Sequence, residues 1–244
     1  MLWYNFCVKI LLTNDDGINA PGLQALAASL QTEYECLIAA PFSEKSACGH
    51  SISLGQKLII DEQGPRQFAI HGTPADCVKF ALSELKDTFQ PDLLISGINP
   101  GPNTGVSVYY SGTISAAREG LINQIPSVAV SLGLKTSLDF SYAAVFTRRL
   151  IEGYEKGYFP KDVLLNVNNP ALSETEIRGV KIARQAPSRF IEEFIAEDSQ
   201  DHRRTYRLAG EIEIFDPDGT TDEEVLRQGF IALTPLKLDL TDYS

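Results

Sequence analysis

The chain of 244 residues is predicted to adopt an α/β fold. Over its first two thirds, short apolar runs typical of strands alternate with segments whose apolar residues recur at helical spacing. Such alternation indicates a mainly parallel sheet with helices on both faces. After about residue 170 the apolar residues thin out, and residues 211–215 alternate as a half-exposed strand does. We therefore expect a Rossmann-like three-layer sandwich at residues 1–184. A β-rich C-terminal extension at residues 185–244 is expected to pack on this core or on a second subunit.

The positions of the helices and strands follow from their boundary residues. A helix is expected to begin at Pro21, because proline at the first helical position loses no hydrogen bond. Another is expected after Thr73, an N-cap residue followed by Pro74 and by Asp76 in the first turn. The predicted strands are residues 8–13, 36–40, 92–96, 126–130, 163–167 and 211–215, with a further apolar run at 230–233. The predicted helices are residues 21–30, 74–85, 113–121, 142–154 and 222–227.

The charge and composition of the chain restrict its partners. The formal net charge is -11, whereas binding of a nucleic-acid polymer depends on neutralising phosphates with Lys and Arg. A small phosphorylated ligand is still compatible with this charge, since a bound metal can supply local positive charge. No run reaches the roughly 18 apolar residues of a membrane span, and the first residues lack the basic region of a signal peptide. We expect a cytoplasmic protein that binds neither nucleic-acid polymers nor membranes.

Paired carboxylates follow the first predicted strand, in the segment Asn14-Asp15-Asp16-Gly17. Two adjacent carboxylates at the end of a buried strand repel each other and lose solvation, and a cation offsets both costs. Their hard oxygen ligands favour Mg²⁺, Mn²⁺ or Ca²⁺. The alternative is an Asp-Asp-Gly turn with both side chains in water.

Two further polar loops follow strands, at residues 41–51 and 96–105. The second of these is rich in Gly and Asn and leads to Ser111-Gly112-Thr113, which opens a predicted helix. Backbone amides and hydroxyls at the positive end of a helix suit a phosphate, although Ser111 or Thr113 could also simply cap the helix. Because ligands of parallel sheets bind beyond the carboxyl ends of the strands, a metal at the aspartates is expected to face this anion site.

Motifs of other nucleotide- and phosphate-using enzymes do not occur in the sequence. It contains no G-x-x-x-x-G-K-[ST] loop and no G-x-S-x-G nucleophile segment, and its helix-opening glycine regions lack G-x-G-x-x-G.

A set of segments spread over nearly the whole chain carries a family resemblance. They are Ile10-Leu11-Leu12-Thr13-Asn14-Asp15-Asp16-Gly17, residues 20–22, 40–41, 72–76, 96–99, 110–113, 165–168, 221–222 and 234–236, Ser46 and His50-Ser51. In these segments the chain resembles the SurE (survival protein E) nucleotidases, most specifically in the first and third loops.

The resemblance implies a metal-dependent phosphomonoesterase that hydrolyses nucleoside 5′- or 3′-monophosphates. It implies one divalent cation per subunit, Mg²⁺ or Mn²⁺, held by residues matching Asp15, Asp16, Ser46 and Asn99. The phosphate would be held by residues matching Asn103, Ser111, Gly112 and Thr113. On this reading the catalytic residues are Asp15, Asp16, Asn99 and Ser111. The resemblance also implies subunit exchange through the C-terminal region, and hence a homodimer or homotetramer.

Several assignments stay open at the level of the sequence. His50 is a candidate general acid for the leaving alkoxide, with a hydrogen-bonding role in its loop as the alternative. Tyr109 or Tyr110 could stack on a base, and Lys45 could contact phosphate. Asp15 or Asp16 could act as a covalent nucleophile instead of a metal ligand. A nucleotide-sensing or binding protein without turnover is the alternative from another functional class.

Overall fold

The computed structural model of the chain describes residues 8–133, 138–160, 162–200, 202–215 and 218–243. Residues 1–7, which open the predicted core, lie outside this part. A nine-stranded sheet runs through the molecule, with the strand order β3-β4-β2-β1-β5-β6-β7-β11-β8. Parallel pairing joins β4 (Gln67–Ile70), β2 (Glu35–Pro41), β1 (Lys9–Thr13), β5 (Leu93–Pro100), β6 (Ser127–Leu132) and β7 (Leu164–Asn169).

The outer strands add antiparallel pairs. One edge is β3 (Ile60–Gly64), which is antiparallel to β4. Near the other edge, β11 (Ile231–Leu236) runs antiparallel to β7 and parallel to the short strand β8 (Val180–Ile182). Segment 185–244 therefore supplies one strand of the main sheet.

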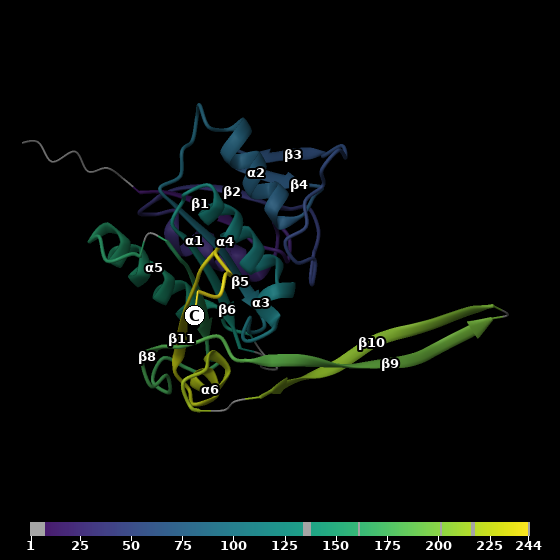
Figure 1. The fold of residues 1–244 in the computed structure, drawn as a ribbon. Coiled ribbons are helices and arrows are strands. Elements are labelled where there is room, and N and C mark those ends of the chain that lie inside the picture. Colours follow the sequence, from purple (N-terminus) through teal and green to yellow (C-terminus); the bar gives the residue numbers. More distant parts are fainter. Residues whose placement is uncertain (1–7, 134–137, 161, 201, 216–217, 244) are drawn as a thin grey trace, which may run out of the picture.

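Helices cover both faces of the sheet (Figure 1). One layer contains α1 (Pro21–Leu30) and α5 (Ser141–Glu155), which pack on each other and on one buried cluster. The other contains α2 (Pro74–Glu84) and α4 (Gly112–Ile122), which enclose the second buried cluster. The predicted three-layer α/β fold is confirmed. None of the described helices combines the length and hydropathy needed to cross a bilayer.

The three polar loops lie at one edge of the sheet, because each follows one of three neighbouring parallel strands. β1 lies between β2 and β5 and runs parallel to both, so the segments that follow these three strands emerge side by side. The strand β5 extends to Pro100, beyond the predicted end at Ser96, and its register with β6 shifts between Ser96 and Asn99. A short helix, α3 (Ser107–Tyr110), then precedes α4. The third loop is thus shorter than the sequence predicted, and part of the segment that follows it is helical.

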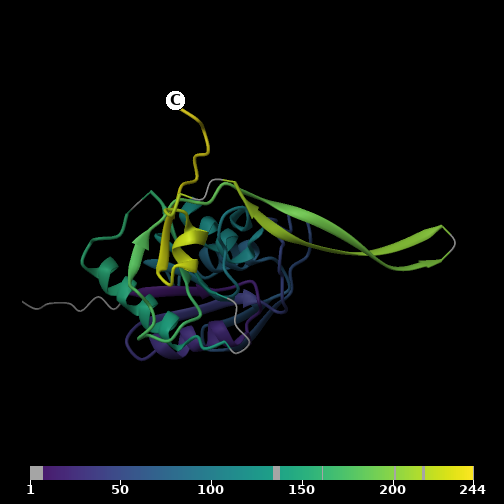
Figure 2. The same cartoon turned by 90° about the horizontal axis from the view of Figure 1, so that it is seen from below.

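The largest difference from the predicted elements is a long hairpin, β9 (Ser188–Gln200) and β10 (Arg203–Ile214). It projects from the body of the molecule in both views (Figures 1 and 2). The sequence predicted only residues 211–215 as a strand here, and it missed the edge strands β3 and β8 as well. The hairpin residues are mostly exposed, so no buried face imposes the apolar alternation by which a strand is predicted. Beyond the hairpin, α6 (Asp222–Arg227) packs beside β11.

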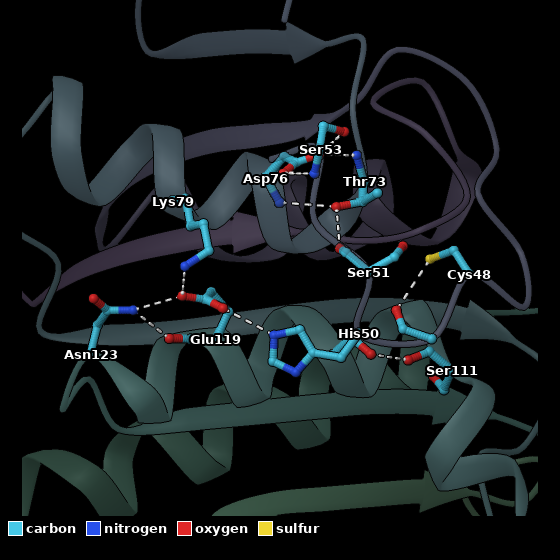
Figure 3. A network of polar contacts seen from close by, with 12 residues as sticks. Cys48, His50, Ser51, Ser53, Thr73, Asp76, Lys79, Ser111, Glu119 and Asn123 are labelled. Carbon is cyan, nitrogen blue, oxygen red and sulfur yellow. Dashed lines mark hydrogen bonds and ion pairs between the residues drawn. The ribbon is translucent and has the colours of Figure 1, made fainter. Parts of the chain in front are cut away.

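Two buried carboxylates on α2 and α4 hold the end of the second polar loop and the residues that follow it (Figure 3). Asp76 on α2 accepts hydrogen bonds from the backbone N–H and the hydroxyl of Ser53, and from the N–H of Thr73. Glu119 on α4 contacts His50 Nε2 at 3.0 Å and Lys79 Nζ at 2.7 Å, and accepts a further hydrogen bond from Asn123. Burial alone would raise the pKa of Glu119, but these hydrogen bonds outweigh it and lower the pKa to about 2. This part of the chain is therefore held at two points by buried carboxylates that are hydrogen-bonded.

The low pKa of Glu119 makes a prediction about stability. A carboxylate whose pKa is depressed by folding stabilises the folded state above its ordinary pKa of 4.5, and this contribution is lost as the pH falls toward 2. Glu119→Gln should lower Tm at neutral pH by about 4–8 °C, equivalent to about 2 kcal/mol in a chain of this size. Thermal melts at a series of pH values should show that the difference in Tm between Glu119→Gln and wild type becomes smaller below pH 4.5. Glu62→Gln, a change on the exposed face of β3, is the matched control. A gap that stayed constant with pH would contradict the charged role of Glu119.

Candidate active site

A cavity of about 310 Å³ lies at the edge of the sheet where β1, β2 and β5 end. It is lined by residues from all three polar loops and from the start of α4. The site residues predicted from the sequence that line it are Asp15, Asp16, Ser46, Asn99, Asn103 and Ser111. Larger hollows elsewhere, such as one of about 760 Å³ near the C-terminal end of α5, lack this convergence of polar groups from strand ends. We therefore identify the smaller cavity as the candidate active site.

The aspartate pair lines this cavity, with Asp15 buried and Asp16 half-buried. Asp15 is 5% exposed, and its Oδ1 accepts a hydrogen bond from Thr113 Oγ1. Burial raises the pKa of Asp15, although the hydrogen bonds oppose the rise. Burial also raises the pKa of Asp16, and the charges of Asp15 and Glu44 add to the effect, so that it reaches about 7. Among the described residues Asp16 Oδ2 has no hydrogen-bond partner. Burial and the nearby like charges therefore disfavour full ionisation of the pair unless a positive charge lies beside it.

Ser46 and Asn99 bring neutral oxygens to the same cavity. Asn99 Nδ2 donates to the carbonyl of Gly101 at 2.6 Å, which leaves its amide oxygen available to the cavity. The hydroxyl of Ser46 donates to Glu44 Oε1 at 2.6 Å. Within the part of the chain that the structure describes, no three His, Cys, Asp or Glu side chains form a metal-binding group. A cation here would therefore depend on the two aspartates together with hydroxyl and amide oxygens, a set that suits hard cations.

The start of α4 also borders the cavity. Ser111 is the N-cap of this helix, and its Oγ accepts from the N–H of Ile114 at 3.1 Å, so the capping role considered for it is present. Gly112 lies so close to Asp15 that an added Cβ would be 2.6 Å from the Asp15 Cβ. The hydroxyl of Thr113 is fully buried and directed to Asp15. Thr113 therefore connects the helix to the carboxylates, and only Ser111 of the three lines the cavity.

Buried amides hold Asn103 in place. Its backbone N–H donates to Asn168 Oδ1 at 2.8 Å, and its side-chain Nδ2 donates to Ser131 Oγ at 2.9 Å. Asn166 Nδ2 donates to its carbonyl at 2.7 Å. Asn166 and Asn168 come from β7, in the segment that contributed to the family resemblance. These bonds fix where the third loop enters the cavity.

The structure does not bring every candidate residue to the cavity. The ring of His50 is directed toward Glu119 and away from Ser111 (Figure 3), and His50 is not among the lining residues. This arrangement matches the hydrogen-bonding alternative and gives a general-acid role no geometric support. Lys45 contributes its backbone N–H, which donates to the carbonyl of Asp15 at 2.7 Å. Tyr110 lines the cavity, whereas Tyr109 does not.

Glu44 is a cavity residue that the sequence reasoning did not single out. The feature of the sequence that could have identified Glu44 is its position in the second polar loop, two residues before Ser46. Ser107 was missed as well, because α3 was not predicted.

Comparisons with known proteins agree with this geometry. The family model described as survival protein SurE matches residues 10–192. A protein named 5'-nucleotidase SurE from Moorella thermoacetica is 47% identical over 96% of this chain and 92% of its own length. One of the same name from Trichodesmium erythraeum is 44% identical over 96% of this chain and 93% of its own length. The crystal structure of the SurE protein from Aquifex aeolicus superposes with a TM-score of 0.85 at 34% identity, covering 96% and 95% of the two chains. The match extends over the strands, loops and helix that build the cavity, and the chain belongs to the SurE family.

Proposed function

We propose that this protein is a metal-dependent 5′-nucleotidase that hydrolyses nucleoside monophosphates to nucleoside and phosphate. The observation that carries the proposal is the charge of the cavity. Its described lining residues include three carboxylates, Asp15, Asp16 and Glu44, and no Lys or Arg. A phosphomonoester dianion can bind beside such groups only if a cation lies between them. The names of the relatives, 5'-nucleotidase SurE, support the same activity.

The cation of this proposal is one Mg²⁺ or Mn²⁺ per subunit. Asp15, Asp16, Asn99 and Ser46 would hold it, and the unpartnered oxygen of Asp16 is the clearest sign that a ligand belongs there. When bound, such a cation supplies a Lewis acid that stabilises charge on the phosphate and lowers the pKa of a bound water. Ser46 would exchange its hydrogen bond with Glu44 for this role.

Asn103 and Ser111 would hold the remaining phosphate oxygens, whereas the backbone amides of Gly112 and Thr113 are directed to Asp15. Ser111 and Asn103 line the cavity, and the positive end of an 11-residue helix favours an anion. Gly112 allows the backbone to approach, while Thr113 acts indirectly by fixing Asp15. The base would extend toward Tyr110, which is 54% exposed. The reaction breaks the phosphorus–oxygen ester bond, with water as the attacking group and the nucleoside as the product that leaves.

A covalent route through Asp15 or Asp16 is the rival mechanism. Asp15 is disfavoured as a nucleophile because its Oδ1 already accepts from Thr113. Acid quench of the enzyme during turnover of labelled substrate would trap a phosphoenzyme if the covalent route operated. No observation favours the non-catalytic alternative.

The assembly of the proposed enzyme is a homodimer or homotetramer in which residues 185–244 take part. The hairpin exposes large apolar side chains, among them Phe194 at 66%, Leu208 at 57% and Tyr206 at 47%. Exposed apolar groups gathered on one projecting element are typical of a surface that a partner covers. The expected cytoplasmic location stays a prediction from the sequence.

The metal assignment predicts the behaviour of Asp16→Asn. The variant should lose more than about 100-fold in phosphate release from AMP, because the cation loses a charged ligand. Titration of Mn²⁺ followed by electron paramagnetic resonance should show weaker binding. The Tm of the metal-free protein should rise, because the repulsion from Asp15 and Glu44 is relieved. Asp87→Asn makes the same change on an exposed residue and should match wild type. Normal activity and Mn²⁺ binding in Asp16→Asn would rule out the proposed site.

The assembly prediction is tested by shortening the hairpin. Removing residues 193–209 and joining the paired residues Glu192 and Gly210 through an Asn-Gly turn keeps β11 in the main sheet. Light scattering should then show a smaller particle than the full chain forms, with the cooperative melt retained. A full-length protein that is monomeric at micromolar concentration would contradict the proposed assembly.

The substrate prediction follows from recognition at the phosphate end. AMP, GMP, CMP and UMP should all release phosphate, because the cavity contacts the group that they share. A short single-stranded oligonucleotide without terminal phosphates should stay intact, since its internal diesters lack the dianion and the chain carries a net charge of -11. Assay of the four nucleotides beside the oligonucleotide tests this. Internal cleavage without phosphate release from any monophosphate would show that a different bond is hydrolysed.

A further inference from the structure

A fully buried carboxylate, Asp222, lies where three separate segments meet. These are the loop at residues 103–107, the segment 184–188 that leads into β9, and the start of α6. In Figure 1, α6 lies beside the base of the β9–β10 hairpin, next to the body of the molecule. The side chain of Asp222 therefore connects the active-site loop to the root of the projecting hairpin.

The two oxygens of Asp222 have different partners. Oδ1 accepts from the backbone N–H groups of Ala186 at 3.0 Å and Glu223 at 2.9 Å. The N–H of Gly105 donates to Oδ2 at 3.1 Å, with a longer contact of 3.3 Å to Oδ1. Within the described part of the chain, the N–H of Gly105 is the one donor that hydrogen-bonds to Oδ2. This oxygen serves the active-site loop.

The loop and the hairpin root also contact each other directly. Gly105 has φ +50°, and a Cβ there would lie 2.3 Å from Ser188 Oγ, so no larger residue fits this approach. The N–H of Val106 donates to Ser188 Oγ at 2.8 Å, and Gln185 Nε2 donates to the carbonyl of Gly105 at 2.8 Å. The two segments form one packed unit around Asp222.

Capping of α6 does not account for Asp222. Thr221 is the N-cap of this helix, and its hydroxyl accepts from the N–H of Glu224. A neutral residue after the cap would continue the helix. Burying this carboxylate costs desolvation free energy. The backbone amides of Gly105 and Ala186, which lie outside the helix, offset that cost by donating hydrogen bonds.

We propose that Asp222 is a positioning residue for the phosphate side of the active site. It acts through the N–H of Gly105, which lies two residues from each of Asn103 and Ser107, both of which line the cavity. The inference rests on the proposed function, in which Asn103 contacts phosphate. Ala186, at the root of the hairpin, also binds Asp222, and Ser188 binds Val106. The position of Asn103 therefore depends on the root of the hairpin as well.

Asp222→Asn tests the role of one oxygen. If the Asn oxygen keeps the bonds from Ala186 and Glu223, its NH₂ group takes the place of Oδ2 and faces the N–H of Gly105, donor against donor. The KM for AMP and the inhibition constant of inorganic phosphate should both rise about tenfold, while kcat changes less than about threefold. Hydrogen exchange at residues 103–107 should become faster than in wild type. A purely structural defect would lower kcat through the inactive fraction and leave KM unchanged.

Glu223→Gln is the matched control on the neighbouring residue. It removes the same charge, but its amide oxygen can still accept from Thr104 Oγ1 as Glu223 does, so its KM should stay within about twofold of wild type. Should Asp222→Asn fail to fold, Ser188→Ala removes the acceptor of the Val106 N–H at a partly exposed position and should raise KM about threefold. Unchanged KM and exchange in the folded variant, or an equal rise in Glu223→Gln, would overturn the inference. Lack of phosphate release by wild type would instead refute the proposed function.

Discussion

The negative charge of Asp15 and Asp16 is the constraint around which the candidate site is built. Both follow the central strand of a parallel sheet, where burial removes water from two adjacent carboxylates. Thr113 and nearby amides offset part of the cost for Asp15, and no described residue supplies the missing hydrogen bond to Asp16 Oδ2. A protein tolerates such a pair when it gains a bound cation, and the same burial that destabilises the empty pair strengthens the attraction for that cation.

Other buried carboxylates in the molecule show what a structural role looks like here. Asp76 and Glu119 are each surrounded by donors, and hydrogen bonds lower the pKa of both in spite of burial. They hold the second polar loop, which carries Ser46, against α2 and α4. Asp222 is likewise satisfied by backbone amides. Burial raises the pKa of Asp222 as it does that of Asp16, which reaches about 7. Asp16 differs from Asp76, Glu119 and Asp222 in having a buried oxygen without a hydrogen-bond partner among the described residues, which fits its proposed role as a metal ligand.

How much the sequence could predict depended on burial. The strands β1, β2, β5, β6 and β7 are buried on both faces, so their apolar runs were plain, and the edge at which their loops meet followed from parallel topology. Asp15, Asp16 and Ser111 were predicted as site residues because polar residues at strand ends and helix starts are local patterns, whereas Ser46 and Asn99 were predicted only from the family resemblance. The hairpin β9–β10 was missed because it is exposed on both faces. Contacts such as Asp222 with Gly105, which are 117 residues apart, have no local pattern and follow only from the folded chain.

The location of positive charge connects these observations to activity. In the proposed function, a chain with net charge -11 binds a phosphate dianion in a cavity whose described lining contains no Lys or Arg. The attraction would then come from a bound cation and from the positive end of α4, which both act over a short range. On this proposal, small displacements of the loop that carries Asn103 would change phosphate affinity more than they would in a site with long, flexible basic side chains. This sensitivity explains why the loop is fixed from two directions, by the buried asparagines of β7 and by the anchor it shares with the hairpin root.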